Sequence, residues 1–270
     1  MDKQATVQFF KKFGAGAVIG LGSIIPGVSG GVIAVTMGLY ESILEAITSF
    51  FKNPRRNILF LLPLGIGAGF GILAFSNLIA WLMENYGEQV LFLFIGFVVG
   101  GIPSLFKKAN SQGFKMELLI FFILGLIIIL LPTQLELIAH DSQGKELDFS
   151  MALLSGSILA VGTIVPGMSS SFILIYMGTY ESILKAISTL DIMTLFPVGI
   201  GFLLGALMTI KIVNYLFKRF QAHSYYAVLG LLIGSIVLIV PPLSLSFKLL
   251  INILMFALGS VMAYFLEKRV

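Results

Sequence analysis

Serine hydroxyls placed beside proline and glycine interrupt the apolar sequence at two positions. Ile24 to Gly31 reads Ile-Ile-Pro-Gly-Val-Ser-Gly-Gly, and Ile164 to Ser171 reads Ile-Val-Pro-Gly-Met-Ser-Ser-Ser. Proline cannot donate a backbone hydrogen bond and glycine permits unusual backbone angles, so a helix should stop at each break. The next helix then begins with unpaired N–H groups, a serine cap and the positive end of its dipole, which favour an anion such as phosphate. The predicted substrate-binding residues are Pro26, Gly27, Ser29, Gly30, Gly31, Pro166, Gly167, Ser169, Ser170 and Ser171.

Such a break has a simpler interpretation, in which it is only a packing kink and the serine hydroxyl bonds its own backbone. The second copy of the break favours a site instead. Interrupted hydrophobic segments at corresponding places in two halves of a chain are typical of transporter binding sites.

A tyrosine and a glutamate follow each break, at Tyr40-Glu41 and Tyr180-Glu181. A carboxylate in apolar surroundings is costly, so it is usually functional or paired. We therefore predict a gating or coupling role for these four residues, with Lys211 as a further candidate. The alternatives are an interfacial helix that begins at Tyr40 or Tyr180, and a Lys211 side chain that extends to the cytoplasmic end of its helix.

The two breaks belong to an internal duplication. Between Ser23 to Ile47 and Thr163 to Ile187, 14 of 25 aligned positions are identical at a constant offset of 140 residues. With an offset of 134, a proline and several glycines of the first half fall on those of the second half. The glycine rows Gly65, Gly67, Gly69, Gly71 and Gly199, Gly201, Gly205 are expected to permit close helix packing.

The composition indicates a membrane protein. Hydrophobic residues make up 58% of the 270 residues and charged residues 11%, with a mean hydropathy of +1.03. The N-terminal segment lacks a cleavage signal and is expected to remain. The chain has no cysteine, and its two histidines lie far apart, so neither a disulfide framework nor a metal site is expected. The net charge of +4 lies in short loops and does not indicate nucleic-acid binding.

The predicted fold is an all-α polytopic membrane protein with an inverted-topology repeat, each half being one re-entrant helical hairpin plus three transmembrane helices. The hairpin arms are too short to cross a bilayer comfortably, which favours re-entrance. The first repeat covers 1–135, with a hairpin at 13–50 and crossings at 58–83, 90–106 and 116–131. The second repeat covers 150–270, with a hairpin at 151–189 and crossings at 195–216, 225–240 and 249–266.

Loop charges predict the orientation, because lysine and arginine collect on the cytoplasmic side. Basic loops at 52–56, 107–115 and 218–219 alternate with acidic or uncharged loops. This places both termini in the cytoplasm. Three crossings per half make the number odd, so the two halves have opposite orientations and the hairpins open to opposite sides.

The duplicated Ile-Pro-Gly-Val-Ser-Gly-Gly and Met-Gly-x-Tyr-Glu-Ser-Ile-Leu motifs resemble those of the PopT family of bacterial polyprenyl-phosphate translocases. The resemblance implies a flippase that returns undecaprenyl phosphate from the outer to the inner leaflet of the cytoplasmic membrane, for reuse in cell-envelope synthesis. It implies undecaprenyl phosphate and membrane lipids as partners. No cofactor is expected, although coupling to protons or sodium fits the glutamates, and the sequence does not predict an oligomeric state.

Two other functions share some of these features. Undecaprenyl-pyrophosphate phosphatases are similar in their inverted repeats and Pro-Gly-x-Ser-Arg motif, but Gly30 and Ser170 stand where that arginine would be. A pyrophosphate would call for such a bidentate cation. A transporter of a small soluble anion is the other alternative.

Overall fold

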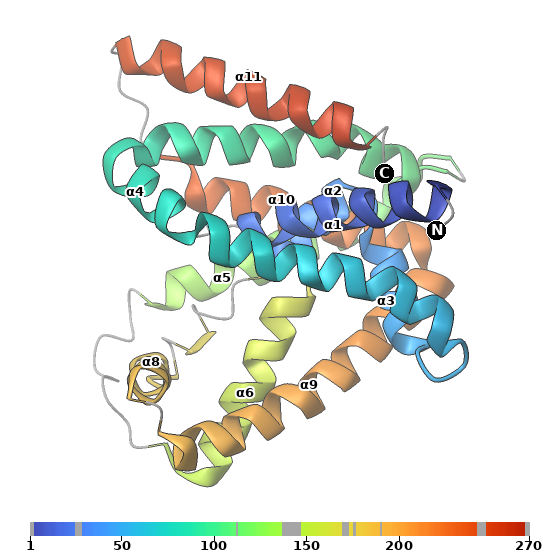
Figure 1. Ribbon diagram of the computed structural model, residues 1–270. Helices are drawn as coiled ribbons and strands as arrows, with labels where there is room; N and C mark the ends of the chain where they lie inside the picture. Colours follow the sequence, from blue (N-terminus) through green and yellow to red (C-terminus); the bar gives the residue numbers. More distant parts are fainter. Residues whose placement is uncertain are drawn as a thin grey trace.

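The computed structural model describes residues 3–24, 29–111, 113–136, 147–168, 173–174, 177–189, 191–241 and 247–267, and these form helices and short connections (Figure 1). The prediction of an all-α chain is confirmed over these residues. The elements run in the order α1 (Lys3–Ile24), α2 (Gly30–Thr36), α3 (Tyr40–Thr48), α4 (Pro54–Ala109), η1 (Met116–Leu118), α5 (Leu119–Glu136), α6 (Phe149–Ile164), α8 (Tyr180–Ser188), α9 (Ile192–Arg219), α10 (Gln221–Ile239) and α11 (Phe247–Glu267).

Four of the described helices are long and apolar enough to cross a membrane, and these are α4, α9, α10 and Lys248–Phe265 of α11. Two shorter apolar helices, Met116–Leu131 and Phe149–Ile164, accompany them. Large apolar side chains cover the outside of these helices, and Leu73 and Met193, for example, are 81% and 86% exposed. Such an exterior fits lipid surroundings, where burial away from water does not require burial inside the protein.

Helix α4 combines two of the predicted crossings, 58–83 and 90–106. Its 56 residues would extend about 84 Å if straight, far more than one bilayer thickness. Tyr86 has non-helical angles, φ −138° and ψ 35°, and the helix folds back at this point. Figure 1 shows the two arms extending from this bend toward the same side of the molecule and diverging, so that the chain runs through them in roughly opposite directions. We refer to residues 54–85 as the first arm of α4 and to residues 87–109 as its second arm.

The segment predicted as the first hairpin, 13–50, contains the end of α1 and the whole of α2 and α3. The connection between α2 and α3 bends the chain by 111°, and Gly38 at this bend has φ +70°, a conformation that favours glycine. With 7 and 9 residues, α2 and α3 are about 10 and 13 Å long, so neither could cross a bilayer by itself.

Glycines bring the helices of each half into close contact. A Cβ atom added to Gly67 or Gly71 would overlap the carbonyl oxygen of Phe13 or Ala17, so the first arm of α4 packs directly on the backbone of α1. In the second half, Gly201 meets the Leu153 carbonyl in the same way, which joins α9 to α6. The predicted role of the glycine rows is confirmed for Gly67, Gly71, Gly201 and Gly205, whereas Gly65, Gly69 and Gly199 face open space.

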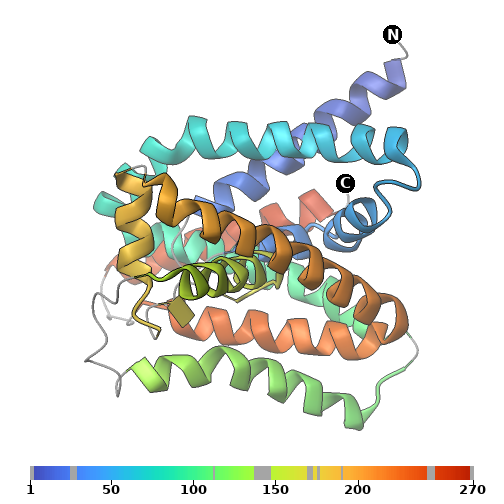
Figure 2. The same cartoon turned by 90° about the horizontal axis from the view of Figure 1, so that it is seen from below.

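Other glycine contacts join one half to the other. Gly96 on the second arm of α4 lies against the Phe256 carbonyl of α11, and Gly230 on α10 lies against the Phe122 carbonyl of α5. These are corresponding pairs, since Gly96 aligns with Gly230 and Gly125 of α5 aligns with Gly259 of α11. Figure 2 shows α10 and α5 lying side by side along the lower edge. The second arm of α4, from the first half, therefore packs against α11, the last helix of the second half. In the same way, α10 of the second half packs against α5, the last helix of the first half.

The glycine contacts predict a position-specific effect on stability. Gly67→Ala should lower the free energy of unfolding by about 1–3 kcal/mol, because the new methyl group must displace the α1 backbone. Gly65→Ala is the matched control, since nothing lies within 4 Å of its added Cβ and alanine favours a helix. Thermal unfolding in detergent would measure both variants. Equal stability of the two would contradict the α1–α4 contact.

Candidate functional site

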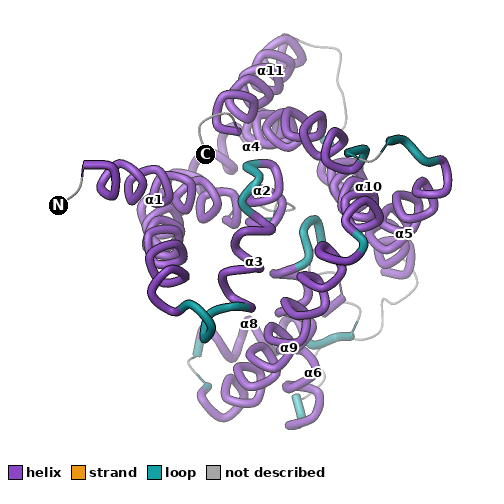
Figure 3. Tube along the Cα trace, turned by 90° about the vertical axis from the view of Figure 1, so that its right-hand side faces the viewer, coloured by secondary structure: helices purple, strands orange, loops and turns teal. Residues whose placement is uncertain are grey.

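Described parts of both breaks line one cavity of about 440 Å³. Figure 3 shows α3 between α1 and α9, and the cavity lies among these helices and the end of α6. Its lining includes the start of α2, one face of α3 and the turn after α6. The residues are Ile19, Ser23, Ser29, Gly30, Gly31, Ala34, Tyr40, Ile43, Leu44, Ile47, Gly162, Thr163, Ile164, Gly167, Met168 and Ile210.

Ser29 begins the helix that follows the first break. Its backbone is extended, with φ −99° and ψ 138°, and its Oγ accepts a hydrogen bond of 3.1 Å from the Gly31 N–H. This is the cap arrangement expected for serine. As in the packing-kink interpretation, the hydroxyl bonds the local backbone, here two residues away. In this bond, however, the serine oxygen is the acceptor. The hydroxyl proton therefore remains able to donate to a ligand in the cavity.

The second break is a tight turn. Helix α6 ends at Ile164, and the Met168 N–H donates to the Val165 carbonyl at 3.3 Å across Pro166 and Gly167. Gly167 has φ +82°, which suits the third position of such a turn and requires glycine. An added Cβ there would also lie 3.0 Å from the Leu231 carbonyl oxygen. The turn thus fixes the end of α6 against α10.

The two breaks touch each other. A Cβ added to Gly31 would lie 3.5 Å from the Pro166 Cα, so the start of α2 packs on the second break. The Tyr40 hydroxyl donates a hydrogen bond of 2.7 Å to the Ile164 carbonyl oxygen, 124 residues away in the sequence. That carbonyl lies in the last turn of α6, where carbonyl groups lack helical partners. Tyr40 therefore joins the first half of the chain to the second at the cavity wall.

Two further hydroxyls in the cavity were missed by the sequence reasoning. Ser23 Oγ donates to the Ile19 carbonyl at 2.9 Å, and Thr163 Oγ1 donates to the Leu159 carbonyl at 2.7 Å. They occupy corresponding positions, three residues before each proline, and this pairing of two hydroxyl residues in the duplication was the available signal. The remaining lining is mainly isoleucine and leucine. The cavity therefore combines a few hydroxyl groups with apolar walls.

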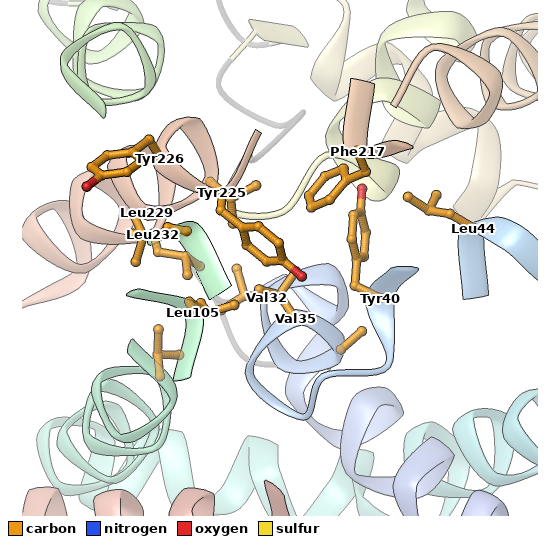
Figure 4. Close-up of a cluster of buried hydrophobic side chains, with 14 of the residues drawn as sticks. Val32, Val35, Tyr40, Leu44, Leu105, Phe217, Tyr225, Tyr226, Leu229 and Leu232 are labelled. Carbon is orange, nitrogen blue, oxygen red and sulfur yellow. The ribbon is translucent and has the colours of Figure 1, made fainter. Parts of the chain in front are cut away.

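Glu41 lies outside this cavity, on the far side of Tyr40. The Tyr225 hydroxyl donates to Glu41 Oε1, and Lys108 Nζ lies 5.9 Å from the centroid of the Tyr225 ring. All three residues line a small neighbouring pocket together with Tyr40 and Gly38. Figure 4 shows Tyr40, Phe217 and Tyr225 meeting in a buried cluster, and all three line the small pocket. Glu41 is thus a paired charge near a cation, and not a lining group of the hydroxyl cavity.

The other predicted residues are distributed differently. Tyr180 begins α8 and is partly buried, while the side chain of Glu181 lies outside the described residues, as do Pro26, Gly27, Ser169, Ser170 and Ser171. Lys211 is exposed on α9 beside Ile210, and it does not belong to the described lining of the cavity. The structure thus brings together five of the predicted residues, Ser29, Gly30, Gly31, Tyr40 and Gly167, in the cavity lining. Pro166 is not among the described lining residues but packs against Gly31.

Known proteins similar to the chain were found by comparison. The family model for VCA0040-like, undecaprenyl phosphate translocase-like proteins matches residues 19–252. A polyprenyl-phosphate transporter of Vibrio cholerae is 28% identical over 86% of this chain and 77% of its own length. A polyprenyl-phosphate transporter of Staphylococcus aureus is 27% identical over 92% of each chain. No solved structure gives a significant match.

Loss of the Tyr40 hydrogen bond to Ile164 should favour an open form of the cavity. Tyr40→Phe keeps the ring but removes the bond to Ile164, which should cost about 1 kcal/mol and raise the open population about fivefold. The chain has no cysteine, so Ala34→Cys supplies a single thiol at a cavity-lining position that is only 3% exposed, and its labelling rate reports opening. Tyr226→Phe is the control, since it removes a 2.8 Å bond to Asn110 elsewhere. Similar labelling rates in both backgrounds would contradict the closing role of Tyr40.

Proposed function

The chain belongs to the undecaprenyl phosphate translocase-like family, and we propose that it moves polyprenyl phosphate across the bacterial cytoplasmic membrane. The transported lipid would be undecaprenyl phosphate, carried from the outer to the inner leaflet for reuse in cell-envelope synthesis. Both curated relatives are named polyprenyl-phosphate transporters, and each matches most of this chain. The proposal makes the chain a transporter and not an enzyme.

The observation that carries the proposal is the cavity shared by the two breaks. A polyprenyl phosphate has a small anionic head and a long apolar tail, so its site must offer hydrogen-bond donors beside apolar walls. Ser23, Ser29 and Thr163 supply hydroxyls, and the α3 face supplies Ile43 and Ile47. The head would bind among the hydroxyls, while the tail would leave between helices into the lipid.

Ser29 is the best-placed donor to the phosphate, because its oxygen already accepts from Gly31 and its proton has no partner among the residues that the structure describes. Ser23 and Thr163 would contribute by rotating away from the carbonyls of their own helices. Ser169, Ser170 and Ser171 are proposed to supply the corresponding hydroxyls of the second break. Since α2 has only 7 residues, its dipole is a minor contribution to binding.

Alternating access is the proposed mechanism, with two re-entrant hairpins in halves of inverted orientation. The reciprocal glycine contacts between the halves support a two-fold relationship, since corresponding helices exchange partners. Opening would break the Tyr40–Ile164 bond, which joins the halves at the cavity. Loops that the charge pattern assigns to one side also meet, since Lys115, Lys218 and Arg219 line one pocket. Both termini are proposed to be cytoplasmic.

Coupling to a proton or sodium gradient is proposed to involve Glu41. Its carboxylate accepts from Tyr225 of the second half and lies near Lys108, and Tyr40 lines both the pocket of this cluster and the cavity. Neutralising Glu41 would weaken the contact with Tyr225 and leave the charge of Lys108 free for the lipid phosphate. A change at Glu41 would thereby be transmitted to the wall formed by Tyr40.

Replacing Ser29 predicts a loss of transport. Ser29→Leu should reduce leaflet-resolved movement of undecaprenyl phosphate in proteoliposomes by at least about tenfold, because the donor is lost and the cavity is filled. Ser29→Ala should have a smaller effect. Ser76→Leu is the control, since that hydroxyl contacts the Leu73 carbonyl of its own helix and does not line the cavity.

Transport, phosphate release and binding together separate the other functions. Undiminished transport by Ser29→Leu would remove the site assignment. Release of inorganic phosphate from undecaprenyl pyrophosphate by the purified protein would instead identify a phosphatase. Equal binding of inorganic phosphate and of the lipid would favour a transporter of soluble anions.

Replacing Glu41 predicts a loss of gradient dependence. Glu41→Gln should make transport insensitive to imposed pH or sodium gradients while exchange without a gradient continues, because the titratable group is absent. Glu45→Gln is the control, since Glu45 is exposed and forms a surface ion pair of 3.3 Å with Lys218. Wild-type transport that ignores both gradients would reject the coupling proposal.

A further inference from the structure

A second polar pocket, of about 200 Å³, lies where two basic loops meet. The loop that leads from α4 into η1 contributes Lys115, and the last turn of α9, at its corner with α10, contributes Lys218 and Arg219. Glu117 is the acidic residue among the described lining groups. The pocket therefore carries a net positive charge, with three cations and one carboxylate. It shares no described lining residue with the cavity at the breaks.

An apolar groove of about 600 Å³ adjoins this pocket on the outside of α5. Glu117 and His223 line both the pocket and the groove, so the two spaces are adjacent. The groove is lined by Met116, Ile120 and Ile123, which are 74%, 58% and 51% exposed. An exposed apolar groove on a helix of this kind would face hydrocarbon in the membrane.

His223 stands at the boundary between the two spaces. Its ring packs edge-on against Phe121 and Phe220, with centroids 4.7 Å and 5.8 Å away, so its orientation is fixed. Its Nδ1 atom is buried and has no hydrogen-bond partner among the described residues. A buried polar atom without a partner is costly, which marks this boundary as a position of unsatisfied polarity.

We propose that the pocket and groove bind an anionic glycerophospholipid of the inner leaflet. The phosphate of the head would lie between Lys115 and Arg219, and an acyl chain would follow the groove along α5. Charge complementarity favours an anionic over a zwitterionic lipid, and the adjoining apolar groove favours a lipid over inorganic phosphate. The separation from the cavity at the breaks favours a resident membrane lipid over the transported substrate.

Such a lipid would connect the two halves of the chain. The η1–α5 wall belongs to the first half, whereas the corner between α9 and α10 belongs to the second. Lys218 at this corner also forms the 3.3 Å ion pair with Glu45 of α3, the helix that lines the transport cavity. Lipid binding would therefore stabilise the arrangement of the halves around the cavity.

Native mass spectrometry of the detergent-solubilised chain, titrated with phosphatidylglycerol or phosphatidylcholine, tests the proposal. The wild type should bind phosphatidylglycerol more tightly. Lys115→Gln combined with Arg219→Gln should lower that affinity about 25-fold, since each surface cation contributes about fivefold. Lys52→Gln combined with Arg55→Gln is the matched control, because these exposed cations lie outside the pocket, and it should change the affinity little.

Two milder variants keep the test valid if the double variant folds poorly. His223→Phe preserves the ring packing but removes both ring nitrogens, and Ile120→Ser changes an exposed wall of the groove. Both should weaken phosphatidylglycerol binding, and Ile120→Ser should leave binding of glycerol phosphate unchanged. Equal losses in the pocket and control pairs would overturn the proposal. Tighter binding of undecaprenyl phosphate than of phosphatidylglycerol would also overturn it, because the pocket would then be a second binding site for the transported lipid.

Discussion

The contact between the two breaks is the constraint on which the structure depends. In a bilayer, an irregular backbone leaves N–H and C=O groups that lipid cannot satisfy, and each unsatisfied group costs several kcal/mol. The protein answers this with internal partners, since Ser29 accepts from Gly31 and Tyr40 donates to the Ile164 carbonyl. The described parts of the two breaks meet at Gly31 and Pro166, and they line one cavity that contains hydroxyl groups.

Close packing of the surrounding helices holds the two breaks in contact. Lipid tails are as apolar as leucine, so the helices gain little from the hydrophobic effect and depend on close van der Waals contact. The glycines supply this contact by allowing backbone to touch backbone, within each half at Gly67 and Gly201 and between the halves at Gly96 and Gly230. The same pattern in both halves gives the cavity two equivalent supports.

Charged groups are arranged around the cavity rather than inside its described walls. Glu41 is held by Tyr225 and lies near Lys108, while Glu45 pairs with Lys218. Both pairs bring α3 to the end of the molecule where the basic loops meet. One face of helix α3 thus lines the cavity, while Glu41 and Glu45 of the same helix contact Tyr225 and Lys218. Movement of α3 would change the cavity, the Glu41 cluster and the pocket at Lys115 together.

Several features were readable from the amino-acid order. The duplicated breaks, the apolar helices and the glycine rows depend on local backbone chemistry and periodicity, which are written directly in the chain. The hydroxyl cap at Ser29 and the turn at Gly167 follow from the same local rules. Family membership also followed from the motifs, because both copies retain the tyrosine and glutamate at fixed spacing.

Other features were decided only by the tertiary structure. Which glycines pack depends on helix rotation, so Gly67 touches α1 while Gly65, two residues earlier, faces open space. The partners of Tyr40 and Glu41 lie 124 and 184 residues away, and no local pattern identifies them. Lys211 lies inside an apolar run, yet its side chain is exposed because α9 turns that face outward. Local proline and glycine chemistry sets where the helices break, whereas the packing of two halves far apart in the chain sets what the breaks enclose.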